Sequence, residues 1–414
     1  MSAPADYDLI IAGGGMVGAS LACALRDAPL KLAVVEATPF QAPAHAGFDA
    51  RTLALGHGSR RILDTLGLWP AIEAAGVTPI HRIHVSDRGH LGSSHLDRRD
   101  EGLDALGYVT EIRSPGGVLH AALQAQANVD FLCPARVADV RLEPLRAHLR
   151  LDTDDGGREI TGRLLVAADG GNSPIRQRLG IGSFRLGYGQ HAIIANVAVD
   201  RPHANVAYER FTAEGPMALL PARDPDGGDR MFALVWTVPD TRREEILALD
   251  EAAFLARLQQ RFGERAGRFL QAGRRHAYPL GWMQSREHVR PRLAVIGNAA
   301  HTLHPVAGQG FNLGLRDVAT LAQVVVDGVR AGRDPGELGL LRDYARWRRR
   351  DQLTTALFTD ALVRVFSNEL PPLALARNIG LTVLDTVPPL KRLLARQAMG
   401  FGGKLPRLAR GLPL

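Results

Sequence analysis

The hydrophobic pattern places strands and helices alternately near both ends of the chain. Short apolar runs at 8–12 and 32–35 flank a helical pattern at 19–26, and another apolar run occupies 164–168. Further on, "RLAVI" leads through a glycine-rich turn into "LRDVATLAQVVVDGV", whose apolar residues recur with the helical period. These elements predict an α/β sheet assembled from segments far apart in the sequence.

The pattern in the centre of the chain is different, because apolar and polar residues alternate there as in β-strands. The pattern appears in "HRIHVSDRG" and, between 184 and 278, in "QHAIIANVAV", "ANVAYERFT", "PMALLPAR" and "RMFALVWTVP". It predicts an inserted antiparallel sheet that covers a ligand and lines its pocket. The expected division is a dinucleotide-binding domain at 1–75, 100–182 and 279–340, a substrate domain at 76–99 and 183–278, and a helical basic region at 341–414.

Composition fits a globular protein, with 46% apolar and 22% charged residues, and the net charge of +7 is uneven. Residues 341–414 hold 13 Arg or Lys against 5 Asp or Glu, so the rest of the chain sums to −1. This surplus is either a solvated helix face in an Arg-rich chain or a contact surface for anionic lipid or an acidic protein. Both interpretations stay open, and we expect no nucleic-acid partner.

The start of the chain and its cysteines bear on location. A strand pattern begins within the first seven residues of the chain, which leaves no room for a secretory signal. Cys23 and Cys133 lie far apart without a CxxC, which fits a reducing compartment and argues against a zinc site. No apolar run approaches the ~20 residues of a spanning helix. We expect a cytoplasmic protein, with peripheral association with the inner membrane as an open alternative.

The first glycine loop carries the pattern G-x-G-x-x-G between a strand and a helix. Gly13 permits the sharp turn, Gly15 lets the backbone approach a pyrophosphate, and Gly18 lets helix and strand pack closely. Glu36 ends the second strand, where its carboxylate can accept hydrogen bonds from ribose hydroxyls and disfavours a 2′-phosphate. The loop therefore predicts bound FAD or NAD rather than NADP.

Two later strands also end on polar turns. Asp169 and a glycine follow one strand, and Asn172 or Ser173 can cap a helix that opens with Pro174. Taken alone, this pattern favours a strand-end turn with a helix N-cap and no ligand. The stretch at 297–314, "GNAAHTLHPVAGQGFNLG", repeats the arrangement, so that three separated segments together suggest one long ligand.

The three motifs resemble the fingerprints of FAD-dependent aromatic hydroxylases of the para-hydroxybenzoate hydroxylase type: GxGxxG, an Asp-Gly strand end, and GDAAHxxxPxxGxGxN. The resemblance covers essentially the whole chain and is greatest to the ubiquinone-biosynthesis hydroxylases, through "DARTLAL", "HVSDRGHLG", "GNAAHTLHPVAGQGFNLGLRDV" and "FSNELPPLALARNIGL". It implies an α/β fold, with a Rossmann-like FAD-binding domain of the GR2 flavoprotein type, an inserted antiparallel β-sheet substrate domain and a helical C-terminus.

The resemblance also implies residue roles. It assigns the ADP-binding loop to Gly13, Gly15, Met16, Val17, Gly18 and Glu36. It assigns Arg51 to the flavin, Asp169 to the pyrophosphate and Asn298 to the ribityl chain. Pro305 would lie beside the isoalloxazine, with the helix start facing its pyrimidine edge through Gly308, Gln309, Gly310, Phe311 and Asn312. The candidates for a direct catalytic role are Arg51, His304 and Pro305.

Three positions remain ambiguous from sequence. Arg51 is either a cation near the flavin or part of a structural ion pair. His301 and His304 favour local structural roles, with catalysis or proton relay as the alternative, because no carboxylate or cysteine completes a metal set. Val118 stands where many relatives carry Arg, which weakens any pyrophosphate contact there. No residue stands out as the catalytic base.

The resemblance implies a specific reaction. NAD(P)H would reduce FAD transiently, O2 would form a C4a-hydroperoxyflavin, and the substrate would be a polyprenylated phenol, 2-octaprenyl-6-methoxyphenol, converted to 2-octaprenyl-6-methoxy-1,4-benzoquinol. A sister hydroxylase that attacks another ring carbon is the nearest alternative. A non-catalytic member of a complex with other ubiquinone-biosynthesis proteins is a second one. A halogenase is disfavoured, because "LVWTVP" lacks the WxWxIP pattern.

Overall fold

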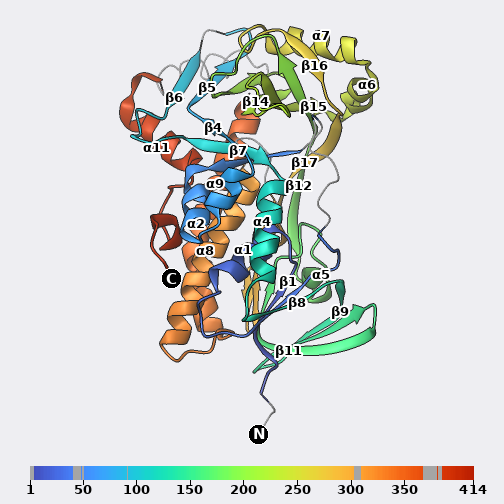
Figure 1. The fold of residues 1–414 in the computed structure, drawn as a ribbon, viewed down its shortest axis with the longest axis vertical. Helices are drawn as coiled ribbons and strands as arrows, with labels where there is room; N and C mark the ends of the chain where they lie inside the picture. The colour runs from blue at the N-terminus through green and yellow to red at the C-terminus, as the bar shows by residue number, and fades with distance from the viewer. Residues whose placement is uncertain are drawn as a thin grey trace.

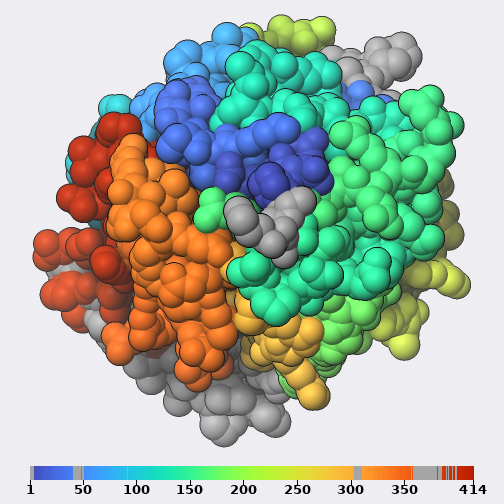
Figure 2. Space-filling view, turned by 90° about the horizontal axis from the view of Figure 1, so that it is seen from below, coloured from blue at the N-terminus to red at the C-terminus, as the bar shows by residue number. Residues whose placement is uncertain are grey.

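The computed structural model describes residues 4–40, 48, 51–90, 92–302, 309–366, 380 and 385–414. Figure 1 shows one sheet above another, with the long helices α8 (Gln309–Arg330) and α9 (Leu338–Phe366) beside the lower sheet. The far part of α9 reaches the upper sheet, where it contacts β14 (Gly215–Ala222). Seen from below in Figure 2, the start of the first strand lies between the α8–α9 pair and the strands that follow residue 134.

The lower sheet has eight strands, and its core is parallel. The order is β18-β19-β11-β1-β2-β8, and β10 pairs with both β11 and β9. Strands β19, β11, β1, β2 and β8 run parallel, so their carboxyl ends share one edge. The strands are β1 (Tyr7–Ala12), β2 (Leu32–Val35), β8 (Val129–Leu132), β9 (Ala135–Leu142), β10 (Ala147–Thr153), β11 (Gly156–Ala167), β18 (Val289–Arg290) and β19 (Leu293–Val295).

Both faces of this sheet are buried, which explains its uninterrupted apolar runs. Leu9 and Ile11 point into a core shared with α1 (Met16–Ala24), α8 and α9. Ile10 and Ala12 point the other way, into a core formed with β9 and β10. The strands predicted at 8–12 and 32–35 and the helix after the second glycine turn are confirmed to within a few residues. The strand predicted at 164–168 is the end of a longer strand, β11, which begins at Gly156.

The upper sheet has nine strands in the order β20-β17-β12-β15-β14-β13-β5-β6, with β16 paired to β12. The antiparallel prediction is wrong at one place, because β5 and β13 run parallel. The chain leaves the sheet after β6 and returns only at β12, and such a long excursion permits a parallel pair. The strands are β5 (Arg82–Asp87), β6 (Ser93–Asp97), β12 (Ser183–Val199), β13 (Val206–Thr212), β14, β15 (Met231–Pro239), β16 (Phe269–Ala272), β17 (His276–Ser285) and β20 (His301–Thr302).

The two faces of the upper sheet differ. Its outer face packs under α6 (Arg243–Ala248) and α7 (Glu251–Phe262) around an aromatic core. Its inner face turns toward the lower half of the molecule, where Ala207 and Ala222 pack against Ile80 and Val109. Those two residues belong to a three-stranded sheet of β3 (Thr52–Gly56), β7 (Gly107–Glu111) and β4 (Val77–Ile80).

Shorter helices complete the frame: α2 (His57–Thr65), α3 (Trp69–Ala74), α4 (Arg113–Gln124), α5 (Pro174–Arg178), α11 (Pro388–Ala398), η1 (Asp240–Arg242), η2 (Gly297–Ala299) and η4 (Leu408–Arg410). The expected domain boundary after residue 278 falls inside β17, which continues to Ser285 in the upper sheet. Among the described helices, none is long and apolar enough to span a bilayer.

Candidate flavin and substrate site

The first glycine loop has the geometry that its pattern predicts. Gly13 has φ +104°, and a Cβ there would overlap the carbonyl oxygen of Ala168. A Cβ on Gly18 would overlap the carbonyl of Gly13, so helix α1 can approach β1 only with glycine at that position. Gly15 differs, because no protein atom lies within 4 Å of the place its Cβ would occupy. The start of α1 is therefore open in front of Gly15, which no side chain caps.

Glu36 is held at the end of β2 by two backbone amides. Its Oε2 accepts from Gly14 N at 2.7 Å, and its Oε1 accepts from Thr38 N at 2.9 Å. The carboxylate thus faces the loop in a fixed orientation, and each oxygen keeps a lone pair for another donor.

Asp169 follows β11 and presents one satisfied and one unsatisfied oxygen. Oδ2 accepts from Ile175 N at 3.0 Å, whereas Oδ1 is buried without a hydrogen-bond partner in the described structure. Burial raises the pKa of Asp169, although hydrogen bonds from Ser173 and the Ile175 amide oppose that rise. Ser173 caps α5 by accepting from Arg176 N at 3.1 Å, as one of the two predicted caps. A buried unpaired oxygen is costly unless a ligand donates to it.

The second glycine turn begins at η2. Gly297 has φ +59°, and Asn298 is exposed although both of its neighbours are buried. A Cβ on Gly297 or on Gly314 would lie 3.0 Å from Val17, so this turn and α8 lie directly against the start of α1. The side chain of Val17 therefore packs against this turn, although it remains partly exposed.

Several candidates in the second turn lie at or beyond the edge of the described structure. His304, Pro305 and Gly308 are outside the described residues, as is the side chain of Gln309. Gly310 lies in the first turn of α8, and no atom of the described residues lies within 4 Å of its Cβ position. Phe311 is partly buried against the main core.

Asn312 joins α8 to the segment that carries Arg51. Its Oδ1 accepts from Gly56 N at 2.9 Å and Ser59 Oγ at 2.6 Å, and its Nδ2 donates to Ala54 O at 3.0 Å. Arg51 precedes this strand, is exposed, and donates to the Tyr278 hydroxyl at 3.3 Å. Among the described residues Arg51 has no carboxylate partner, so the structural ion pair considered from sequence is not seen there. Arg51 instead connects the lower half of the molecule to the upper sheet.

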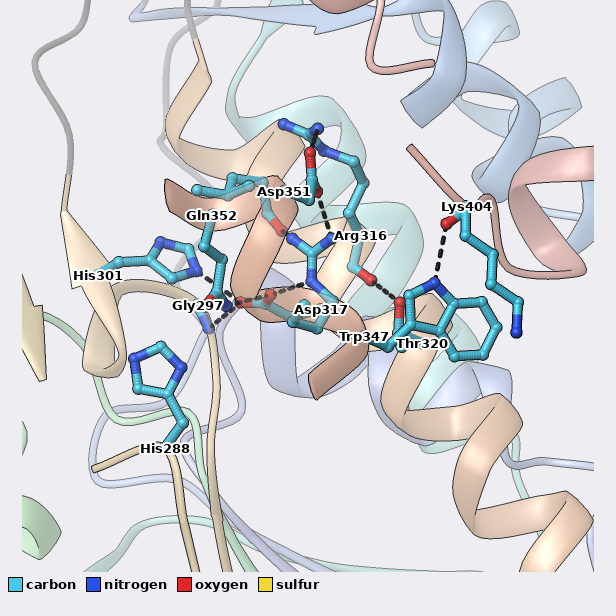
Figure 3. Close-up of polar contacts among 12 residues, drawn as sticks. His288, Gly297, His301, Arg316, Asp317, Thr320, Trp347, Asp351, Gln352 and Lys404 are labelled. Carbon is cyan, nitrogen blue, oxygen red and sulfur yellow. Dashed lines mark hydrogen bonds and ion pairs between the residues drawn. The ribbon is translucent and has the colours of Figure 1, made fainter. Parts of the chain in front are cut away.

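A buried charged network lies beneath the second turn (Figure 3). Asp317 Oδ2 accepts from His301 Nε2 at 2.7 Å and from Gly297 N at 3.1 Å. Its Oδ1 accepts from Arg348 Nε at 2.7 Å and Gln352 Nε2 at 2.9 Å. Burial alone would raise the pKa of Asp317, but the charges and hydrogen bonds of His301 and Arg348 outweigh it and hold the pKa well below its usual range.

Sequence reasoning missed Asp317 and Arg348. The available signal was the charged pair "RD" inside the apolar helical run of α8, which indicates charges paired in the interior. His301 has the local structural role favoured from sequence. Nearby, burial and the charge on His301 lower the pKa of His288 to about 4, so His288 is neutral at physiological pH.

The described site fits FAD. Its groups meet beside the shared carboxyl edge of β1, β11 and β19, where α/β sheets bind ligands. The open start of α1 offers free N–H groups to a diphosphate, Glu36 faces the loop, and Asp169 Oδ1 needs a donor such as a ligand hydroxyl. In the described part of the chain, no group of three or more His, Cys, Asp or Glu could hold a metal ion.

Comparison with known proteins decides the family. The model of the FAD binding domain family matches residues 6–351. The chain belongs to this FAD-binding family. It is an FAD-dependent monooxygenase of the aromatic hydroxylase type, whose chemistry uses NAD(P)H and O2.

Full-length relatives narrow the family further. The chain is 40% identical to ubiquinone hydroxylase UbiL of Rhodospirillum rubrum, covering 100% of this chain and 95% of the relative. It is 32% identical to 3-demethoxyubiquinol 3-hydroxylase of Escherichia coli, covering 95% and 98%. The chain therefore falls among the FAD-dependent hydroxylases of ubiquinone biosynthesis. The fold matches p-nitrophenol 4-monooxygenase PnpA from Pseudomonas putida with a TM-score of 0.76, at 18% identity over 96% of this chain and 98% of that one.

Proposed function

We propose that this FAD-dependent hydroxylase converts 2-octaprenyl-6-methoxyphenol to 2-octaprenyl-6-methoxy-1,4-benzoquinol in ubiquinone biosynthesis, with NAD(P)H as reductant and O2 as oxygen source. The observation that carries the proposal is the 40% identity, over the whole chain, to a ubiquinone hydroxylase. The segments "DARTLAL" and "HVSDRGHLG" favour the methoxyphenol step by resemblance.

The chain's own residues would position the cofactor. Bound FAD supplies the redox chemistry and the activation of O2. The N–H groups at the start of α1 would face its diphosphate, Glu36 would accept from a ribose, and Asp169 Oδ1 would accept from a hydroxyl. Asn298 would bond the ribityl chain, and Arg51 would place a positive charge beside the ring.

The residues at the start of α8 would complete the cradle. Pro305 would lie beside the flavin ring, with His304 near it, and the backbone from Gly308 through Gln309, Gly310 and Phe311 to Asn312 would face the pyrimidine edge. A helix N-terminus stabilises negative charge, and reduced flavin is anionic at that edge. The open space at Gly310 supports this role, because a side chain there would hold the ring away.

The substrate's polyprenyl tail suggests delivery from a membrane surface. The basic region at 341–414 includes α11, on which Leu393 is 67% exposed next to Arg392. Leu353 and Leu357 of α9 are also about half exposed. Exposed leucines beside basic residues suit an interfacial contact with anionic lipid. We place the protein in the cytoplasm, at the inner membrane surface, with other ubiquinone-biosynthesis proteins as candidate partners.

A sister step remains a second candidate. The similarity to 3-demethoxyubiquinol 3-hydroxylase, at 32% identity over nearly the full length of both chains, favours it. Both hydroxylations require an electron-rich phenol ring and the same cofactor site, so ring position depends on how the pocket orients the substrate.

Analysis of quinone intermediates tests the proposal. A strain that lacks this gene should accumulate 2-octaprenyl-6-methoxyphenol, and the gene should remove it. Accumulation of 3-demethoxyubiquinol would instead indicate the sister step. A purified protein that is colourless and cannot be reconstituted with FAD would support a non-catalytic role.

A further inference from the structure

One row of residues crosses the inner face of the upper sheet and keeps accessible surface. Its members lie opposite one another on successive strands from β5 to β17: Val85, Glu209, Ala218, Val235, Ile194 and His276. All six are partly exposed. The rows on either side are mostly buried, through Ala207, Ala233 and Asn196 on one side and Phe211, Pro216, Thr237 and Ala192 on the other. We call these six residues the accessible row.

The accessible row lies on the face that turns toward the FAD-binding half. Asn196, beside the row, donates from Nδ2 to the carbonyl of Phe48 at 2.7 Å. Phe48 is three residues before Arg51, and Arg51 donates to Tyr278, which pairs with Ala192 on the same face. The loop that carries Arg51 is thus tied to this face from two sides. The row is therefore directed toward the expected flavin rather than toward solvent.

Glu209 is the only carboxylate in the accessible row. Its side chain makes no hydrogen bond or ion pair with any described residue. Arg210 and His84 point to the opposite face, where Arg210 lies over the ring of Phe262. Asp87, the other acid on the inner face nearby, is next to His90 Nδ1 at 3.2 Å. Glu209 keeps accessible surface although the protein around it strongly desolvates its carboxyl group.

The surroundings of Glu209 explain the raised pKa of its carboxyl group. Its neighbours across the row, Val85 and Ala218, are apolar and short. Burial among them, with no charged group acting on it, raises the pKa of Glu209 to about 8. A carboxylate without a partner at such depth is costly, and a donor brought by a ligand would relieve that cost.

We propose that Glu209 is the catalytic base that accepts the proton of the substrate's phenol hydroxyl. The inference rests on the proposed phenol hydroxylation. Phenols ionise near pH 10, so an ordinary carboxylate is a poor base for them, whereas one with a raised pKa is better matched. Its neighbours across the row, Val85 and Ala218, bring no charge that would compete with the substrate's hydroxyl.

In the proposed reaction, one proton moves from the phenol to Glu209 and later returns to the ring oxygen. Glu209 Oε takes the phenol proton, and the phenolate pushes electron density to the ring carbon that receives one oxygen atom of O2. That carbon then loses its hydrogen as a proton, aromaticity returns, and Glu209 gives its proton back to the ring oxygen. The electrons come from NAD(P)H, and the second oxygen atom leaves as water, which includes the proton lost by the carbon.

The test compares Glu209→Gln with Glu244→Gln, using 2-methoxy-6-prenylphenol as the probe. Glu244 lies on α6, on the outer side of the sheet, and contacts only Arg243 among the described residues. Infrared spectra should show a protonated carboxyl group that ionises near pH 8 in the wild type and in Glu244→Gln, and that is missing from Glu209→Gln. Flavin content should be equal in all three proteins.

Kinetics supply the second readout. At pH 7, kcat of Glu209→Gln should fall about 10²- to 10⁴-fold while KM changes little. It should then recover by about tenfold per pH unit as the free phenol ionises, whereas a purely structural role would give no such recovery. An equal kcat in Glu209→Gln would overturn the assignment alone. A wild type that hydroxylates no prenylated methoxyphenol would overturn the proposed function, and the assignment with it.

Discussion

His301 Nε2 lies 2.7 Å from Asp317 Oδ2, and this pair connects the second glycine turn to the interior of α8. The same carboxylate holds the Gly297 amide and the Arg348 guanidinium, so one residue fixes the turn, the helix and α9. The cofactor candidates Asn298 and Gly310 lie on the two segments that Asp317 fastens together. The site is thus positioned by a buried ion network.

Asp317→Asn should destabilise the fold strongly. The substitution leaves the buried Arg348 charge without its main counter-charge, which typically costs about 3–5 kcal/mol. Denaturant unfolding of the apoprotein measures the loss. Asp327→Asn, on the same helix, is the matched control, because Asp327 is about half exposed and its pair with Arg407 should contribute less than about 1 kcal/mol. Equal effects of the two substitutions would contradict this role for Asp317.

Gly15→Ala and Gly18→Ala should separate ligand binding from folding. A Cβ on Gly15 meets no protein atom, so this variant should fold normally and yet bind FAD at least tenfold more weakly. A Cβ on Gly18 overlaps the Gly13 carbonyl, so this variant should lower the Tm of the apoprotein itself. Calorimetry and FAD titration distinguish the two losses. Unchanged FAD affinity in Gly15→Ala would remove the loop from the cofactor site.

Asn298→Asp should retain FAD and lower its reduction potential. The added negative charge opposes the anionic reduced flavin, and a penalty of about 1.4 kcal/mol corresponds to roughly 30 mV for a two-electron couple. Because Asn298 is exposed, the substitution should not disturb folding. Spectroelectrochemical titration gives the potential. An unchanged potential would place Asn298 away from the flavin.

Glu209 should make stability fall with rising pH. Its folded-state pKa of about 8 exceeds the ordinary value of 4.5, so between these values the native state holds a proton that the unfolded state has released. The free energy of unfolding therefore decreases across this window, by at most about 1.4 kcal/mol per pH unit. Glu209→Gln should remove this decrease, which unfolding titrations at pH 5, 6.5 and 8 (about these values) would reveal. Parallel pH profiles for wild type and variant would show that the carboxyl titrates normally.

Local sequence patterns predicted much of the cofactor half. The strand, turn and helix around Gly18 could be predicted, because the close contact that requires glycine there is with the carbonyl of Gly13, five residues earlier. The helix cap at Ser173 could also be predicted, because a capping hydroxyl accepts a hydrogen bond from the amide three residues later in the chain.

Contacts between segments far apart in the sequence could not be predicted from local patterns. The parallel pairing of β5 with β13 joins segments more than 100 residues apart, and no local pattern reports it. Glu209 looked like any polar residue of an alternating strand until the register put it between Val85 and Ala218. The partners of Asp317 come from α9 and from the second glycine turn, so a single helix pattern could not reveal them.

Oxygen-isotope labelling tests the central claim most directly. The purified flavoprotein would be supplied with NAD(P)H, ¹⁸O2 and 2-octaprenyl-6-methoxyphenol in detergent, and the product would be analysed by mass spectrometry. The account predicts a 1,4-benzoquinol that contains one ¹⁸O atom at the newly hydroxylated carbon. Oxidation of NAD(P)H without ¹⁸O in any prenylated product would contradict it.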